Sequence, residues 1–185
     1  MIRQAKQDDA PAIARLIIAA MGELAAKFVN GTNPEQAIPL FERFAALPAN
    51  QYSYQGTLVY EDAHGICGMI NGYDGALLHQ LRAEFLNHIK SVYNNPYHPE
   101  DETGPGEFYI DCLSVAPVHQ GKGIGRQLLS ALCQRAKSMG HSTAGLLVNK
   151  ENPRAEKLYQ TLGFAKVGDK VLLGTLNHHL QISLS

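Results

Sequence analysis

The sequence predicts an α/β (α+β) fold in a single domain spanning residues 1–185. Two observations support this prediction. About seven short segments have the alternating or apolar character of strands, and polar or glycine-rich turns separate them. Between them lie longer segments whose apolar residues recur every three or four positions, which is the spacing of an amphipathic helix. A chain of 185 residues suits one domain and is long enough to bury a sizeable core.

The first half of the chain is expected to begin with a short strand over Met1–Ala5. A helix should follow, because apolar residues stand at helical spacing from Ile13 to Leu24. Asn33 is a residue type that caps helices, and Pro34 suits the first helical position. A second helix is therefore expected to begin there.

A hairpin and an insertion are expected next. The strands Thr57–Tyr60 and Ile66–Asn71 flank a turn at Asp62–Gly65, which is typical of a hairpin. Residues 72–106 then form an insertion. It begins with a helix of about four turns, predicted from its apolar periodicity. The segment Asn94–Gly106 that ends it is rich in proline, glycine and acids, and long loops in compact domains are usually functional or disordered.

Strands and helices alternate again in the second half. A strand leads through a glycine-rich turn into a helix, another strand leads into another helix, and two strands expected to pair antiparallel end the chain. In order, these segments are Glu107–Val115, Arg126–Ser138, Ala144–Val148, Asn152–Leu162, Lys166–Leu173 and His178–Leu184.

The composition argues against several function classes. The net charge of −1 lacks the basic excess of a nucleic-acid-binding protein. Apolar residues make up 45% and charged residues 18% of the chain, which is ordinary for a globular protein in solution. No apolar run approaches the roughly 20 residues that a membrane-spanning helix needs, and the polar N-terminus lacks the apolar core of a signal peptide. We therefore expect a cytoplasmic protein that binds neither nucleic acid nor membrane.

No metal site is expected from the spacing of the cysteines and histidines. Cys67, Cys112 and Cys133 lack metal-ligand spacing and are expected to be reduced thiols. His178 and His179 are adjacent, so on a strand they would point to opposite faces of the sheet.

The glycine-rich turn is the most informative motif in the chain. Its three glycines stand at alternate positions and leave the backbone free to adopt positive φ. A helix that starts there directs unpaired N–H groups and a partial positive charge into the turn, which favours a phosphate or pyrophosphate ligand. The residues of the turn are Gln120, Gly121, Lys122, Gly123, Ile124, Gly125 and Arg126.

This turn differs from two common phosphate loops. The chain contains no Walker pattern G-x-x-x-x-G-K-[ST], and in a dinucleotide pattern G-x-G-x-x-G read from Gly121 the last glycine would fall on Arg126. The remaining pattern, Q-x-x-G-x-G-R, resembles motif A of the GCN5-related N-acetyltransferase (GNAT) superfamily. The preceding strand ends in L-S-V-x-P, as is usual in that family.

A later segment resembles motif B of the same superfamily, N-x-x-A-x-x-L-Y-x-x-x-G-F. The two motifs stand in the family's order, and the resemblance is sharp over residues 107–165. It implies a GNAT-like fold, with a mixed, mostly antiparallel sheet of about seven strands and helices on both faces. The matching residues of motif B are Asn152, Ala155, Leu158, Tyr159, Gly163 and Phe164.

The resemblance further implies that acetyl-CoA is the cosubstrate. N–H groups of the turn would hold its pyrophosphate, aided by the charges of Lys122 and Arg126. A bulge in the strand would aim an N–H from Leu113 or Ser114 at the thioester carbonyl. The backbone expected to pair with the pantetheine arm is that of Leu113, Ser114 and Val115.

Three side chains are candidates for the chemistry. The amine must lose a proton before attack, and the candidate bases are Asp111 and Glu107. These two residues share a face if the strand is regular, and Asp111 is the nearer of them to the thioester. Tyr159 would protonate the leaving thiolate, as its place in motif B implies. The alternatives are a structurally hydrogen-bonded Asp111 and a core tyrosine. Asn152 either contacts the cofactor or only caps a helix. Strand alternation would place Cys112 on the face opposite Asp111.

The predicted function is acetyl-CoA-dependent N-acetyltransfer from the thioester to a primary amine of a small molecule or peptide, by direct attack in a ternary complex. Two alternatives stay open: a non-catalytic acyl-CoA-binding sensor of the same fold, and an unrelated ATP-binding protein. The acidic loop at residues 100–102 is either a lid that favours a cationic amine or a solvated, mobile loop. The two final strands offer a route to a homodimer.

Overall fold

The computed structural model describes residues 1–184, and its seven strands form one sheet in the order β1-β2-β3-β4-β5-β7-β6. All neighbouring strands are antiparallel except β4 and β5, which are parallel. This confirms the predicted fold class. The strands are β1 (Ile2–Gln4), β2 (Thr57–Asp62), β3 (Gly65–Asp74), β4 (Phe108–Val115), β5 (Thr143–Asn149), β6 (Ala165–Leu172) and β7 (Thr175–Ser183).

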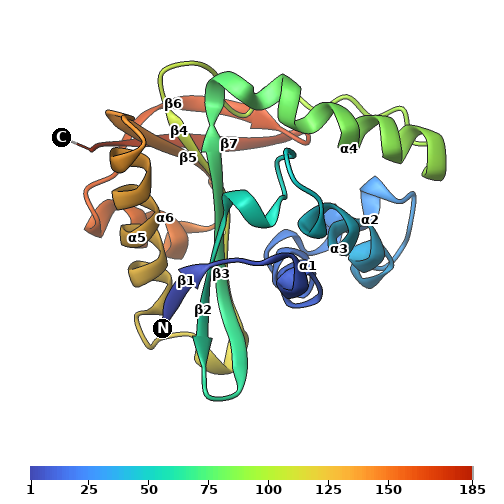
Figure 1. The fold of residues 1–185 in the computed structure, drawn as a ribbon. Helices are drawn as coiled ribbons and strands as arrows, with labels where there is room; N and C mark the ends of the chain where they lie inside the picture. Colours follow the sequence, from blue (N-terminus) through green and yellow to red (C-terminus); the bar gives the residue numbers. More distant parts are fainter. Residues whose placement is uncertain (185) are drawn as a thin grey trace.

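Helices cover both faces of the sheet (Figure 1). The helices α5 and α6 lie on one face, and α1 to α4 lie on the other side. None of the helices within residues 1–184 is long and apolar enough to cross a membrane. The helices are α1 (Ala10–Met21), α2 (Glu23–Phe28), α3 (Ile38–Ala46), α4 (Leu78–Tyr93), α5 (Ile124–Ser138) and α6 (Pro153–Thr161).

Strand alternation divides the apolar side chains between two cores. Val59 of β2 and Met69 of β3 pack with α1 and α3, whereas their neighbours Leu58 and Ile70 pack with α5. Each fully buried aliphatic side chain stabilises the fold by about 1.5–3 kcal/mol. These two cores enclose β4 in the middle of the molecule. The glycine-rich turn begins where β4 ends.

The first predicted helix is interrupted at Gly22. This residue has φ +55°, in the left-handed region that glycine adopts at little cost, and it separates α1 from α2. The prediction of one continuous helix to Leu24 is therefore wrong. Met21 and Leu24, on the two sides of the break, both line a cavity beside β4.

A β-bulge interrupts β4 at Asp111. Ile110 pairs with Gly72 and Cys112 pairs with Asn71, so Asp111 is the extra residue on its strand. The bulge thus lies before Leu113 and Ser114, and the expectation that one of their N–H groups faces the thioester carbonyl stays a prediction. Pairing between β4 and β5 also ends at Ile110, so the two parallel strands separate beyond it.

The insertion packs over the sheet through buried polar contacts. The Tyr73 hydroxyl donates to Glu102 Oε1 at 2.9 Å, and Arg82 of α4 donates to Glu102 Oε2 at 3.2 Å. The Asn95 side chain donates to the Lys27 carbonyl at 2.7 Å. Glu102 is only 4% exposed, so a solvated loop is the wrong description of this residue.

Candidate active site

The glycine-rich turn connects β4 to α5 with the geometry that its glycines permit. Gly121 and Gly123 have φ values of +78° and +77°, and Gly123 is the N-cap of α5. The first N–H groups of α5 therefore face the turn. The Gln120 side chain donates to the Val115 carbonyl at 3.0 Å and ties the turn to the strand. The Gln120 N–H itself bonds to the Pro117 carbonyl at 3.2 Å, so it is not available to a pyrophosphate.

A groove of about 500 Å³ lies between this turn and α6. Arg126 lines it, together with Arg154 and Lys157 of α6, whose participation no motif had indicated. Lys122 is exposed and does not line the groove. The predicted residues that do line it are Leu113, Val115, Gln120, Gly121, Gly123, Ile124, Gly125, Arg126, Asn152 and Tyr159.

A second cavity of about 510 Å³ continues from the groove into the centre of the molecule. It occupies the space where β4 and β5 separate, and the predicted residue Ser114 lines it. Asp111 lines its inner part, beside Cys112. The residues common to the groove and this second cavity are Leu113, Val115, Gln120, Asn152, Ala155 and Tyr159.

Tyr159 of α6 lines both spaces. Its ring packs against Phe164 with a centroid separation of 6.0 Å. Burial, with the nearby Cys112, raises the pKa of Tyr159 to about 12. The phenol therefore keeps its proton at neutral pH, as an acid catalyst requires.

Asn152 caps α6 and also lines both spaces. Its Oδ1 accepts a hydrogen bond from the Ala155 N–H at 3.1 Å, which satisfies one of the free donors at the start of the helix. The helix-cap interpretation is confirmed. A contact between the Asn152 amide and the cofactor stays a prediction.

Asp111 reaches the surface of the second cavity, but its Oδ2 atom is buried and has no hydrogen-bond partner within residues 1–184. Burial raises the pKa of this carboxyl to about 8, and the negative charge of Glu102 adds to the rise, whereas Gln51 opposes it. A carboxyl that titrates near neutral pH is suited to proton transfer.

Glu107 lies outside both spaces. Its carboxylate accepts hydrogen bonds from Thr103 Oγ1 at 2.6 Å, His179 Nε2 at 2.8 Å and Gln181 Nε2 at 2.6 Å. Burial acts to raise the pKa of Glu107, but these hydrogen bonds outweigh it and the pKa is lowered. The carboxylate thus links the insertion to β7, and the structure does not bring it into the site with Asp111.

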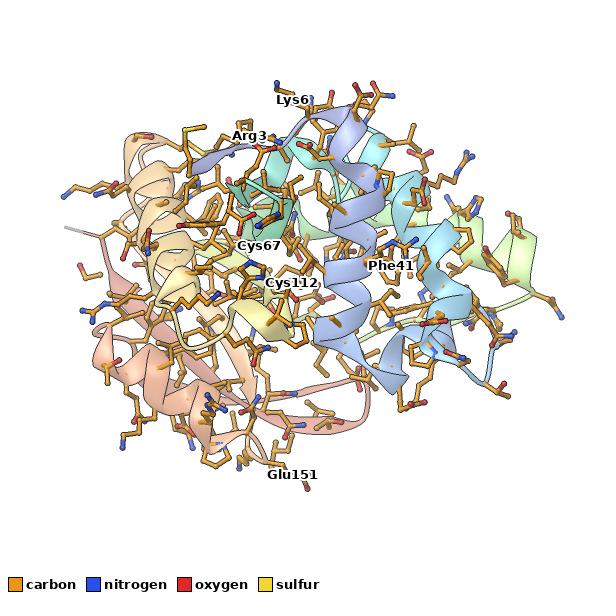
Figure 2. All side chains as sticks on the ribbon, turned by 90° about the horizontal axis from the view of Figure 1, so that it is seen from below. Arg3, Lys6, Phe41, Cys67, Cys112 and Glu151 are labelled. Atoms are coloured by element: carbon orange, nitrogen blue, oxygen red, sulfur yellow. The ribbon has the colours of Figure 1, made fainter. Side chains whose placement is uncertain are left out.

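Cys112 lies on the same side of the sheet as Asp111, so the prediction of opposite faces is wrong. Cys112 packs against the core of α1 and α3, and Asp111 lines a pocket with Phe28 and Tyr52 of that core. The bulge inserts one residue and thereby cancels the alternation. In Figure 2, Cys112 lies centrally, between α1 and α5. Burial raises the pKa of the Cys112 thiol far above its ordinary value, which keeps it protonated.

A cluster of potential metal ligands, Asp62, Cys67 and His119, lies beside the turn, with its ligand atoms within 4.8 Å of one another. His119 Nε2 is 2.9 Å from Asp62 Oδ2, which connects the hairpin of β2 and β3 to the residue before Gln120. Sequence spacing gave no sign of this cluster, because its members come from three separate segments. The contact with Asp62 orients the ring of His119, whose Nδ1 is buried without a partner within residues 1–184.

Comparison with known proteins agrees with this geometry. The model of the acetyltransferase (GNAT) family matches residues 19–164. A solved acetyltransferase structure is 34% identical, covers 100% of both chains and superposes with a TM-score of 0.83. An acetyltransferase from Salmonella typhimurium, solved with its cofactor acetyl-CoA, shares the fold at 22% identity and a TM-score of 0.60, over 100% of this chain and 94% of that one.

A ribosomal-protein alanine N-acetyltransferase of Haemophilus ducreyi is 38% identical over 94 residues, which is 50% of this chain and 65% of the relative. The chain spans less than two thirds of the length of the curated relatives that it matches. Because the family model matches most of the sequence and a solved acetyltransferase aligns over all of it, this chain belongs to the acetyltransferase (GNAT) family.

Proposed function

We propose that this chain is an acetyl-CoA-dependent N-acetyltransferase that acetylates a primary amine of a small molecule or peptide. The amine attacks the thioester directly in a ternary complex. The observation that carries this proposal is the continuity of the two spaces, which share the Tyr159 lining and lead from the start of α5 to Asp111. They offer a binding path for a long, polyanionic thioester that ends beside two groups able to transfer protons.

The chemistry of the lining fits acetyl-CoA. Helix N–H groups and the cations Arg126, Arg154 and Lys157 suit a pyrophosphate. Since β4 leaves β5 after Ile110, the backbone of Leu113–Val115 faces the second cavity without a strand partner on that side, as an extended amide chain requires. When bound, acetyl-CoA would supply an activated acetyl group.

Asp111 would take the proton from the amine. An alkylammonium has a pKa of about 10.4, so transfer to a carboxylate whose acid titrates near 8 costs about 3 kcal/mol, against about 9 kcal/mol for an ordinary aspartate. Tyr159 would donate its proton to the leaving thiolate. The pKa of Tyr159 is higher than that of the leaving thiol, so this proton transfer is unfavourable by itself. A positioned donor still prevents a full negative charge from developing on the sulfur in a site that excludes water.

A CoA-release assay over a panel of amines tests this proposal. We expect acetyl-CoA-dependent release with at least one amine, and thermal stabilisation by acetyl-CoA of about 2.7 kcal/mol at 100 times its Kd. Thermal stabilisation by acetyl-CoA without release of CoA for any amine of the panel would instead support the non-catalytic acyl-CoA-binding sensor. Stabilisation by ATP with Mg²⁺ but not by acetyl-CoA would contradict both acyl-CoA functions.

A further inference from the structure

A small side pocket of about 50 Å³ opens beside Asp111 from the second cavity. Asp111, Tyr52 and Leu173 line both hollows, which makes the pocket a continuation of the proposed site. Its walls are largely apolar and include Phe28 of α2 and Phe85 of α4. The volume is of the order of one or two water molecules, since a water occupies about 30 Å³ of the liquid. A small group such as an ammonium fits this volume, and the rest of an acceptor would lie behind it in the second cavity.

The polar part of the pocket is acidic. Asp111 and Glu102 line it, and no Lys, Arg or His within residues 1–184 lines either this pocket or the second cavity. Arg82 lies behind Glu102, where it donates to Glu102 Oε2 and the Glu100 carbonyl, each at 3.2 Å, and pairs with Asp101. Its charge is therefore already engaged, whereas Asp111 Oδ2 has no partner among the same residues.

This charge pattern discriminates between amines and amino acids. Above about pH 8, where Asp111 is ionised, a carboxylate on the amine-bearing carbon would enter with the amine and face two negative carboxylates, and placing like charges together costs several kcal/mol. The basic side chains Lys27 and His98 line a separate hollow that shares only the wall residues Phe28 and Leu173 with the pocket. A carboxylate one bond from the amine carbon does not extend that far.

The aromatic walls keep the pocket small. Ring centroids of Tyr52 and Phe85 are 4.9 Å apart, and those of Phe28 and Phe85 are 5.3 Å apart, so the rings pack on one another, and each is at most 5% exposed. The pocket therefore has room for an ammonium group only. An apolar body behind that group would lie in the second cavity, whose lining includes Met21, Leu24 and Tyr52.

On the basis of the proposed function, we propose that the acceptor is a primary amine with a short alkyl or arylalkyl body and no carboxylate on its amine-bearing carbon. Its ammonium group would lie against Asp111, and its body in the second cavity beside Met21, Leu24 and Tyr52. Glu102 would act as a positioning residue that keeps the pocket negative. Free α-amino acids would be poor acceptors.

Matched pairs of acceptors test this proposal with the full chain. The pairs are phenethylamine with phenylalanine, and 3-methylbutylamine with leucine, which differ only by the carboxylate. We expect kcat/KM to favour each amine by roughly 100-fold, equivalent to about 2.7 kcal/mol. Equal values, or a preference for the amino acids, would overturn the assignment of the acceptor.

Failure of the proposed function gives a different result. If no member of any pair releases CoA, the transferase assignment fails, and calorimetric binding of the same pairs to CoA-loaded protein still tests the pocket. Tighter binding of the amines would support the acidic pocket. Equal binding, or no binding of any of the compounds, would overturn it.

A substitution separates the role of Glu102 from a structural one. Glu102→Gln removes a charge but keeps oxygen for the Tyr73 hydroxyl, so the fold should survive. We expect the amine KM to rise roughly ten-fold with the acetyl-CoA KM unchanged, and the preference within each pair to narrow. The pKa seen in the pH profile of kcat should fall, because the charge of Glu102 helps to raise the pKa of Asp111. Glu84→Gln, the same change on the exposed side of α4, should alter none of these values. An unchanged preference in Glu102→Gln would refute the positioning role.

Discussion

In its proposed role as the base, Asp111 would serve catalysis at the expense of stability. Asp111 is the extra residue of a bulge, and one of its carboxyl oxygens is buried without a hydrogen-bond partner within residues 1–184. Because the pKa in the folded chain is raised to about 8, the folded state binds more protons than the unfolded state between about pH 4 and pH 8. The stability of the protein is therefore expected to fall as the pH rises through that range.

Asp111→Asn should separate the two effects. We expect kcat to fall roughly ten- to thousand-fold, and the free energy of unfolding at pH 8 to rise by about 1–3 kcal/mol, since a buried charge is removed. Activity of the original chain should increase with pH through about 8, as the carboxyl ionises. Steady-state kinetics and denaturant unfolding measured across this pH range check both effects. A variant with full activity would contradict the role of Asp111 as the base.

Tyr159→Phe tests the acid. The substitution removes one oxygen and keeps the ring that packs on Phe164, so stability should change little. We expect kcat to fall roughly ten- to thousand-fold with little change in the acetyl-CoA KM. A loss confined to the acetyl-CoA KM would assign Tyr159 to binding instead. Tyr60→Phe, outside both spaces, is the matched control.

Among the helices and strands, the start of α5 is the proposed binding site for the pyrophosphate of acetyl-CoA. Gly123→Ala adds a methyl group that would meet no atom within 4 Å, but it forces a φ of +77° on a residue that disfavours it by about 1–2 kcal/mol. The turn should relax and move its N–H groups. We expect the Kd for acetyl-CoA to rise roughly ten-fold with the fold retained, as measured by calorimetry and circular dichroism.

Gly168→Ala provides the control for that substitution. It also meets no atom within 4 Å, and its φ lies outside the left-handed range. Acetyl-CoA affinity should not change. An equal loss of affinity in both variants would show that the glycine turn has no special part in binding.

Glu107 links two elements and is expected to be structural. Glu107→Ala would leave the side chains of Thr103, His179 and Gln181 without their acceptor and should destabilise the fold by about 1–3 kcal/mol, while kcat per folded molecule is kept. Because the folded-state pKa is lowered, this stabilisation is present at neutral pH and decreases as the pH falls below about 4. Urea unfolding at pH 7 and pH 4 measures it. A kcat loss comparable to that of Asp111→Asn would return Glu107 to the catalytic residues.

At the scale of the whole molecule, local patterns predicted more than contacts between distant segments. Apolar periodicity located all seven strands and the main helices, and the glycines of the turn predicted the positive φ values at Gly121 and Gly123. The bulge at Asp111 was missed in the strand alternation, because it depends on the register between β3 and β4 rather than on the residues of β4 alone. That error also reversed the expected face of Cys112.

Other features of the candidate site depend on tertiary packing that no motif encodes. The burial of Glu102 requires both Tyr73 and Arg82, which precede it in the chain by 29 and 20 residues. The cluster of Asp62, Cys67 and His119 likewise forms only when the hairpin meets the turn. Element order could therefore predict the fold, whereas the acidity of the proposed acceptor pocket became visible only in the structure.

The turn before α5 and the gap between β4 and β5 are proposed to hold one acyl-CoA donor together. Calorimetric titration of the full chain with acetyl-CoA measures this binding. We expect saturable uptake of one donor molecule per chain, weakened in Gly123→Ala and retained in Gly168→Ala. The absence of any binding heat at millimolar acetyl-CoA, at more than one temperature, would contradict it.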